Sequence, residues 1–298
     1  MVEDDISVGE ASTRRRGESE TRRSNAMTTP RVPASPAHRV AKPLIIAHRG
    51  ASAVAPENTL AAFRRAIADG AEGIEFDVRL ALDGVPVVHH DSSLRRTGHS
   101  GVMIADRTSA ELSRANVGLW FEESEYWSHA YSDECIPTLA ATLDLLRDFS
   151  GLIFVELKSE PGENIEPLVQ AVCDVIRNSS ISGRIIVKSF RLSFIPLFNS
   201  LCPDVRTAAL FAPKVMTLLR KEKYLVDLAV ELGADELSVH FSLATKKLMK
   251  KAAKHGLPVT IWTVGHPRWL RRAIKLGVNA VITNDPARLI AKRDEFMA

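Results

Sequence analysis

The chain has 298 residues, of which 45% are hydrophobic and 25% are charged, an ordinary composition for a folded globular protein. Its formal net charge of +3 is too small to indicate a nucleic-acid partner. No uninterrupted apolar stretch reaches ~18 residues, so we expect no stable insertion into a membrane.

The beginning of the chain differs in composition from the rest. Residues 1–41 are polar, rich in Arg, Glu, Ser, Thr and Pro, and almost free of large apolar side chains. Such a segment cannot bury enough surface to offset its chain entropy, so we expect a disordered tail before a folded domain over 42–298. This beginning also lacks the apolar core of a secretory signal. The three cysteines, Cys135, Cys173 and Cys202, share no metal-like spacing, so we expect a reducing compartment, the cytoplasm.

The first elements of the folded part alternate between strands and a helix. Residues 44–47 form a short apolar run that predicts a strand. Asn58 is the expected N-cap of a helix whose apolar residues recur at helical spacing over 60–67. Residues 73–78 predict the second strand, and an Asp-Gly turn followed by the apolar run 85–88 predicts a hairpin extension of it.

The rest of the chain repeats this rhythm of a short apolar run and a longer amphipathic segment. Glycines that suit left-handed helix ends follow several of the amphipathic segments, at Gly233, Gly256 and Gly277. About eight strand candidates, each followed by a helix candidate, predict a (β/α)8 TIM barrel. A doubly wound open sheet is the alternative. The later strand candidates are 152–155, 184–187, 206–210, 236–239, 258–262 and 280–283.

One interval interrupts the pattern. Residues 92–136 lack a clear strand, and a loop of that length in a compact domain usually has a function. We interpret it as a small cap inserted after the second strand, over the barrel mouth. A packed structural excursion with its own minor core is an equal alternative and does not exclude the first. Arg95, Arg96 and Thr97 are expected to hold this cap in place, and contact with the phosphate is the alternative for them.

Polar residues collect where the predicted strands end, which is where barrel enzymes place their sites. Because alternate strand residues share a face, Glu75 lies with Asp77, and Glu156 lies with Lys158. Three carboxylates at one barrel mouth need a cation, and oxygen ligands select a hard divalent ion, Mg²⁺ or Ca²⁺. The other polar or aromatic residues at strand ends are His48, Arg49, His90 and Trp262.

These residues together indicate phosphoryl chemistry. Arg49 and Lys158 supply positive charge for an anion, and two histidines accompany the expected metal. Trp262 is either barrel packing or a wall for the substrate. Singly, each residue also has a structural interpretation, such as a hydrogen-bonded histidine or a surface ion pair of small effect. Their joint placement on the first three predicted strands favours a catalytic site.

The sequence resembles the glycerophosphodiester phosphodiesterase family over roughly residues 44–290. The opening signature is His48-Arg49-Gly50, Pro56-Glu57-Asn58-Thr59, Glu75-x-Asp77, Asp83-Gly84 and His90-Asp91. Later matches are Ile136-Pro137-Thr138-Leu139, Glu156-Leu157-Lys158, Ser189-Phe190, Trp262-Thr263-Val264 and Ile282-Thr283. The combination is highly specific, unlike a single short motif.

The resemblance implies a role for each matching residue. Glu75, Asp77 and Glu156 match the metal ligands of the family, which points to one divalent cation. His48 and His90 match its acid–base pair, with His48 expected as the base and His90 as the acid. Arg49 and Lys158 match the residues that hold the phosphate. The implied reaction converts a glycerophosphodiester, a small molecule, to sn-glycerol 3-phosphate and an alcohol.

Three positions near these motifs are left out of the site or depart from the pattern of the family. His89 should face away from His90 in alternating strand geometry, so it is left out of the site. Ala81-Leu82 departs from the polar residues usual before the Asp-Gly turn, with little expected effect on catalysis. Asn284 interrupts the more usual Thr-Asp pair after the last strand, which puts any polar role there in doubt.

Two other functions remain open from the sequence. A lysophospholipase D-like enzyme on the same barrel is the first, suggested by the aromatic residues Trp120, Phe121 and Trp127 of the inserted segment. A catalytically inactive phosphodiester-binding module is the second, although loss of a histidine would be expected there. The sequence predicts neither the alcohol, nor the choice between Mg²⁺ and Ca²⁺, nor the oligomeric state.

Overall fold

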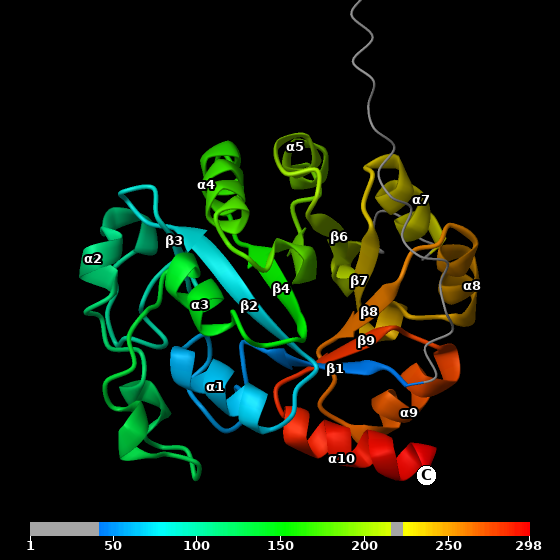
Figure 1. Ribbon diagram of the computed structural model, residues 1–298, viewed down its shortest axis with the longest axis horizontal. Coiled ribbons are helices and arrows are strands. Elements are labelled where there is room, and N and C mark those ends of the chain that lie inside the picture. The colour runs from blue at the N-terminus through cyan, green and yellow to red at the C-terminus, as the bar shows by residue number, and fades with distance from the viewer. Residues whose placement is uncertain (1–41, 216–222) are drawn as a thin grey trace, which may run out of the picture. The chain divides into compact units, whose positions relative to one another are not determined.

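The computed structural model describes residues 42–215 and 223–298, and the expected disordered tail, 1–41, lies outside them. Within these ranges eight parallel strands form a barrel, surrounded by helices (Figure 1). The barrel is closed because β1 pairs with β2 on one side and with β9 on the other. The predicted (β/α)8 TIM barrel is therefore confirmed, and the open-sheet alternative is wrong. The parallel strands are β1 (Leu44–His48), β2 (Gly73–Leu80), β4 (Leu152–Leu157), β5 (Ile185–Ser189), β6 (Arg206–Phe211), β7 (Glu236–His240), β8 (Val259–Trp262) and β9 (Ala280–Thr283).

Helices connect the strands and cover the outside of the barrel (Figure 1). None of those in the described ranges is long and apolar enough to cross a membrane. They are α1 (Leu60–Ala68), α2 (Ser109–Leu112), α3 (Leu139–Leu145), α4 (Glu166–Arg177), α5 (Phe194–Leu201), α7 (Lys223–Glu231), α8 (Lys246–Lys254), α9 (Pro267–Leu276) and α10 (Pro286–Met297). The expected glycine helix ends have positive φ, at Gly233, Gly256 and Gly277.

The second strand carries the predicted hairpin extension. β3 (Pro86–Val88) runs antiparallel to β2, with Val78 opposite Val88. The inserted segment, residues 92–136, follows and contains α2 and three short 3-10 helices, Ile104–Asp106, Leu119–Phe121 and His129–Tyr131. With the hairpin it forms a small hydrophobic cluster of its own: Ala81, Val87, Leu94, Ile104, Leu112, Val117 and Ile136.

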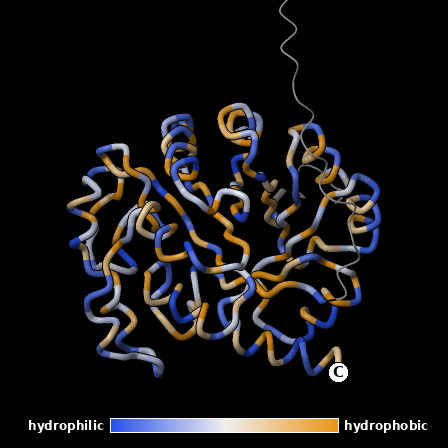
Figure 2. Tube along the Cα trace, in the orientation of Figure 1, coloured by the Kyte–Doolittle hydropathy of each residue, from blue (hydrophilic) through white to orange (hydrophobic). Residues whose placement is uncertain are grey.

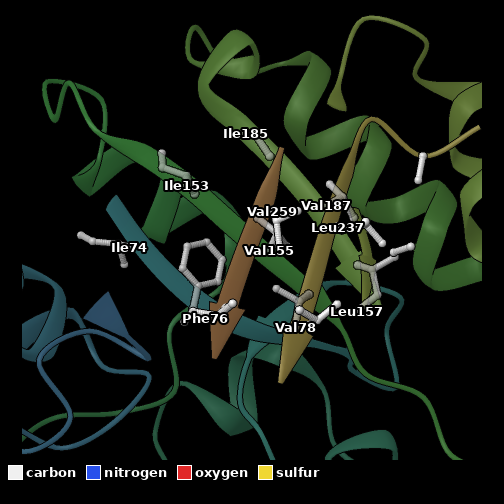
Figure 3. Packing of buried hydrophobic residues seen from close by; sticks show 14 of the residues in the cluster. Ile74, Phe76, Val78, Ile153, Val155, Leu157, Ile185, Val187, Leu237 and Val259 are labelled. Carbon is white, nitrogen blue, oxygen red and sulfur yellow. The ribbon is translucent and has the colours of Figure 1, made fainter. Parts of the chain in front are cut away.

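The two faces of each barrel strand are both buried but differ in character. The apolar residues Ile74, Phe76 and Val78 of β2 belong to the large core shared with the helices (Figure 3). Most strand residues are hydrophobic, whereas hydrophobic and hydrophilic residues alternate along the helices (Figure 2). A second, smaller cluster contains Ile46, Phe154, Ile186 and Ile282 from four different strands. The strand residues two positions later, His48, Glu156 and Lys188, continue this face towards the carboxyl ends of the strands.

The start of α1 differs from the prediction by one residue. The N-cap is Thr59, whose hydroxyl accepts a hydrogen bond from the backbone N–H of Ala62 at 3.2 Å. Asn58 instead has a φ of 57° and donates its amide to Asp77 Oδ2 at 3.0 Å. Asparagine tolerates this left-handed conformation better than most residues. The expectation that Asn58 caps the helix is therefore wrong, because its side chain serves the barrel interior.

Candidate active site

Three carboxylates from two neighbouring strands converge at the barrel mouth. Glu75 and Asp77 lie on β2 and Glu156 on β4, and the parallel register places Asp77 beside Glu156. All three are buried, and one oxygen of each lies within 4.8 Å of the others. Carboxylates this close repel one another unless cations compensate their charge.

Two lysines supply part of that compensation. Lys158 Nζ lies 3.1 Å from Asp77 Oδ1 and also bonds to Glu156, while Lys188 Nζ lies 2.9 Å from Glu75 Oε1. Burial raises the pKa of Asp77, but Lys158 and Arg49 outweigh it and hold that pKa well below its usual range. For Glu156 burial prevails over the lysines, and its pKa is raised. Together with Arg49 the two lysines balance the three carboxylates in number, and of the three only Glu156 has a raised pKa.

The buried oxygens of the cluster fit a hard divalent cation. Glu75 Oε1 and Asp77 Oδ1 are buried, and within the described ranges their close polar neighbours are lysine ammonium groups, Lys188 at 2.9 Å and Lys158 at 3.1 Å, respectively. Carboxylate oxygens are the ligand type that Mg²⁺ and Ca²⁺ take. The donor set is therefore compatible with the expected ion and does not choose between the two.

His48 ends β1 and reaches the cluster with one ring nitrogen. Its Nε2 lies 3.9 Å from Glu75 Oε2, and its Nδ1 lies 2.6 Å from Asn284 Oδ1. An amide oxygen only accepts, so Nδ1 carries the proton and Nε2 keeps its lone pair towards the site. Burial lowers the pKa of His48. The sequence left a polar role after the last strand in doubt, and Asn284 has one, because it is the hydrogen-bond partner of His48.

Arg49 is held over the cluster by the conformation of the loop after β1. Its φ of 56° is left-handed, and its backbone N–H donates to Glu75 Oε2 at 3.2 Å. The guanidinium contacts Asp77 Oδ2 at 3.0 Å through Nε and Glu57 Oε1 at 2.9 Å through Nη1. A side chain fixed at two points and facing the carboxylates is well placed to receive an anion.

The two adjacent histidines after β3 have separate environments. His90 is partly buried, and its Nδ1 lies 2.7 Å from Asp91 Oδ1. Burial lowers the pKa of His90, which also responds to the charges of Asp77, Lys158 and Arg49. His89 is buried, with Nδ1 on the Asp91 carbonyl and Nε2 on Thr97 Oγ1, each at 2.9 Å. Both ring nitrogens of His89 therefore bond to neighbouring loop residues, in agreement with leaving His89 out of the expected site.

Aromatic side chains border the other part of the mouth. Trp262, at the end of β8, is partly buried and meets the Phe190 ring edge to face at 5.5 Å and the His240 ring at 5.4 Å. Phe190 is 46% exposed, and Lys158 Nζ lies 5.8 Å from its ring centre. A cavity of about 420 Å³ opens beside Phe190 and is lined by Glu156 and Lys158 as well.

Three residues of this site were not identified as site residues from the sequence: Lys188, Asn284 and Glu57. Lys188 could have been found, because it follows Ile186 by two on a predicted strand and so shares the face of Glu156. Asn284 and Glu57 lie in loops, where alternation gives no orientation.

Comparison with known proteins places the chain among phosphodiesterases. The model of the glycerophosphoryl diester phosphodiesterase family matches residues 48–288. A glycerophosphodiester phosphodiesterase of Caldanaerobacter subterraneus subsp. tengcongensis is 32% identical over 253 residues, covering 84% of this chain and 97% of the relative.

Solved structures agree with this comparison. A Silicibacter pomeroyi protein, provisionally named a glycerophosphoryl diester phosphodiesterase, superposes with a TM-score of 0.76 at 28% identity, covering 86% of this chain and 94% of that one. A phosphodiesterase of Oleispira antarctica, solved in complex with the product sn-glycerol-3-phosphate, gives 0.74 at 25% identity, with 85% and 97% covered.

Proposed function

Since the chain belongs to the glycerophosphoryl diester phosphodiesterase family, we propose that it hydrolyses glycerophosphodiesters to sn-glycerol 3-phosphate and an alcohol, with one divalent cation and two histidines. The observation that carries this proposal is the convergence of Glu75, Asp77 and Glu156 beside His48. The product bound to the Oleispira antarctica relative supports the identity of the phosphate-containing product.

Glu75, Asp77 and Glu156 would hold the cation, Mg²⁺ or Ca²⁺. When bound, such an ion supplies Lewis-acid stabilisation of charge on the phosphate oxygens. Because it would also neutralise the carboxylates, Lys158 would be less tightly bound to Asp77 and Glu156 and available to the substrate.

The cations of the protein bind the phosphate in this proposal. Arg49 presents a planar fork that matches phosphate oxygens, and Lys158 adds a point charge. Both are already oriented by Asp77, which fixes them before the substrate arrives. Trp262 forms a wall of the substrate site on the aromatic side.

The two histidines divide the proton transfers. His48, with Nε2 unprotonated, removes a proton from the nucleophile. The nucleophile is water, or it is the glycerol 2-hydroxyl, in which case a cyclic phosphate forms as the alcohol leaves and a water molecule then opens it to sn-glycerol 3-phosphate. His90 protonates the leaving alkoxide through Nε2, since Nδ1 is held by Asp91. One neutral and one protonated histidine are required together, so kcat/KM should depend on pH with a bell shape.

The test is phosphorus NMR of a glycerophosphocholine reaction, run with wild type and with His48→Ala, each with and without a chelator. We expect wild type to produce sn-glycerol 3-phosphate, chelator to abolish the reaction, and His48→Ala to slow it roughly 100- to 10,000-fold. His89→Gln is the matched control, because that histidine lies beside the site but has both nitrogens engaged elsewhere. Turnover that persists in excess chelator would contradict the metal requirement, and full activity of His48→Ala would contradict the base.

A lysophospholipid substrate remains the second candidate. Leu119 and Tyr126 of the inserted segment are 44% and 49% exposed, and such side chains suit contact with an acyl chain. Comparing kcat/KM for glycerophosphocholine and lysophosphatidylcholine separates the two substrates. Higher kcat/KM for the lysolipid would favour this second candidate. Membership in an enzyme family and the presence of both histidines disfavour the inactive binding module.

A further inference from the structure

Arg96, on the inserted segment, uses two sides of its guanidinium to join two separate loops. Its Nη2 lies 2.6 Å from Glu57 Oε1, in the loop before α1, and its Nε lies 2.8 Å from Asp91 Oδ2, in the loop after β3. Because both ion pairs come from one planar group, they fix the distance between the two carboxylates and the direction of each.

Each of these carboxylates also holds a residue of the proposed site. Glu57 Oε1 accepts from Arg49 Nη1 at 2.9 Å. The other oxygen of Asp91, Oδ1, lies 2.7 Å from His90 Nδ1. An unbroken series of contacts therefore connects Arg49 to His90 through Glu57, Arg96 and Asp91, and Arg96 is its centre.

The charges in this series are adjusted by Arg96. Burial raises the pKa of Glu57, but the hydrogen bond from Arg96 and the charge of Arg49 outweigh it, and that pKa is lowered. Burial likewise raises the pKa of Asp91, but hydrogen bonds from His90 and Arg96 outweigh it, and that pKa is lowered. Without Arg96, Asp91 would place an unshared negative charge against His90.

The inserted segment determines where Arg96 lies. Its guanidinium carbon is 5.8 Å from the Trp120 ring centre, a cation–π contact within the segment. Two residues earlier, Leu94 packs in the small hydrophobic cluster of the hairpin and the segment. Arg96 therefore connects the packing of the inserted segment to the barrel mouth.

We propose that Arg96 is a positioning residue that fixes Arg49 and His90 together, so that the inserted segment contributes to turnover without touching the reacting atoms. This inference rests on the proposed function, because His90 and Arg49 take their roles from it. The inserted segment would then orient two residues of the site, whereas a cap would only cover the barrel mouth.

The first test compares Arg96→Ala, Arg96→Lys and Arg95→Ala in steady-state kinetics with glycerophosphocholine. Arg95 is the matched control, since it is the neighbouring arginine and is exposed. We expect Arg96→Ala to lower kcat roughly 10- to 100-fold, as loss of an orienting partner typically does. Arg96→Lys should recover only part of this loss, because a point charge cannot serve both carboxylates. Arg95→Ala should match wild type.

The second test measures the pKa of His90 by NMR, which does not depend on turnover. Removing the cation that shares Asp91 should raise the pKa of His90 in Arg96→Ala, because the imidazolium then faces the full charge of Asp91. The other charged groups near His90, namely Asp77, Lys158 and Arg49, are not substituted. His90 is the acid, so the basic limb of the kcat/KM profile should move to higher pH. In an Asp91→Asn background the same substitution should leave the pKa of His90 nearly unchanged.

These measurements separate the inference from the proposed function. If wild type hydrolyses the diester but Arg96→Ala keeps wild-type kcat and an unchanged His90 pKa, the role of Arg96 is overturned and the function stands. If wild type shows no turnover, the function and any catalytic positioning fall together. If Arg96→Ala unfolds at assay temperature, Arg96→Lys decides by the same two readouts.

Discussion

At the scale of single residues, the partner of His48 determines which tautomer this proposed base adopts. Asn284 offers Oδ1 to Nδ1 at 2.6 Å, which leaves Nε2 free to accept a proton near Glu75. Asparagine achieves this without adding a negative charge, whereas a carboxylate in its place would stabilise the imidazolium. The uncharged partner therefore suits a histidine that must be neutral before the reaction begins.

Substitution of Asn284 should separate orientation from charge. We expect Asn284→Leu to lower kcat roughly 10- to 100-fold with a smaller change in KM, because the ring loses its orienting partner. Asn284→Asp keeps an acceptor and should retain more activity. It should also raise the pKa of His48, and since the base must be neutral, the acid limb of the kcat/KM profile should move to higher pH. Steady-state kinetics across pH measure both effects, and identical profiles for Asp and Asn would contradict this role.

At the scale of elements, the loop between β1 and α1 is fixed by a close approach that only glycine allows. Gly50 has a φ of 77°, and a Cβ there would lie 2.6 Å from the backbone carbon of Ala62 in α1. Because Gly50 directly follows Arg49, any shift of the loop also displaces the guanidinium from Asp77. The packing of α1 against this loop thus sets the position of Arg49 in the proposed phosphate site.

Comparing Gly50→Ala with Gly84→Ala tests whether this close approach fixes the loop. Both positions are left-handed, with φ of 77° and 76°, so both alanines cost about 1–2 kcal/mol of conformational strain. Only at Gly50 does the new methyl group collide with backbone, since nothing lies within 4 Å of it at Gly84. We expect Gly50→Ala to lose more thermal stability and to raise KM, while Gly84→Ala keeps wild-type kinetics. Equal effects in unfolding and kinetic assays would exclude the close approach as the cause.

The elements were predictable where periodicity alone decides orientation. Alternation along 73–78 placed Glu75 and Asp77 on one face, and the parallel register with β4 brings Glu156 alongside. The same reasoning extends to Lys188, although its ion pair with Glu75 depends on the closed barrel. Loop residues were less predictable. Asn58 was expected to cap a helix but bonds to Asp77, and a polar role at Asn284 was in doubt although its side chain bonds to His48. Their orientation follows from tertiary contacts that no local pattern encodes.

At the scale of the whole molecule, the closed barrel encloses a further buried acid, besides Glu75, Asp77 and Glu156, that has no role in the proposed reaction. Glu236 begins β7 and is 5% exposed, and its Oε1 accepts from Thr260 at 3.2 Å. Its Oε2 is buried without a hydrogen-bond partner in the described ranges. Burial raises the pKa of Glu236 to about 7, against the opposing charge of Arg206. Closing the barrel therefore favours the neutral form of this acid.

This buried acid should make the stability of the barrel fall as pH rises. Between the ordinary carboxyl pKa of 4.5 and about 7, the folded state binds a proton at Glu236 that the unfolded state has released. The free energy of unfolding should therefore decrease across that interval, by on the order of 3 kcal/mol from this group. Glu236→Gln has a similar shape and no charge, so it should stabilise the protein more at pH 8 than at pH 5. Exposed Glu123→Gln is the control, and denaturant unfolding at both pH values provides the measurement. If Glu236→Gln shifts stability equally at pH 5 and pH 8, Glu236 does not titrate within the barrel in this range.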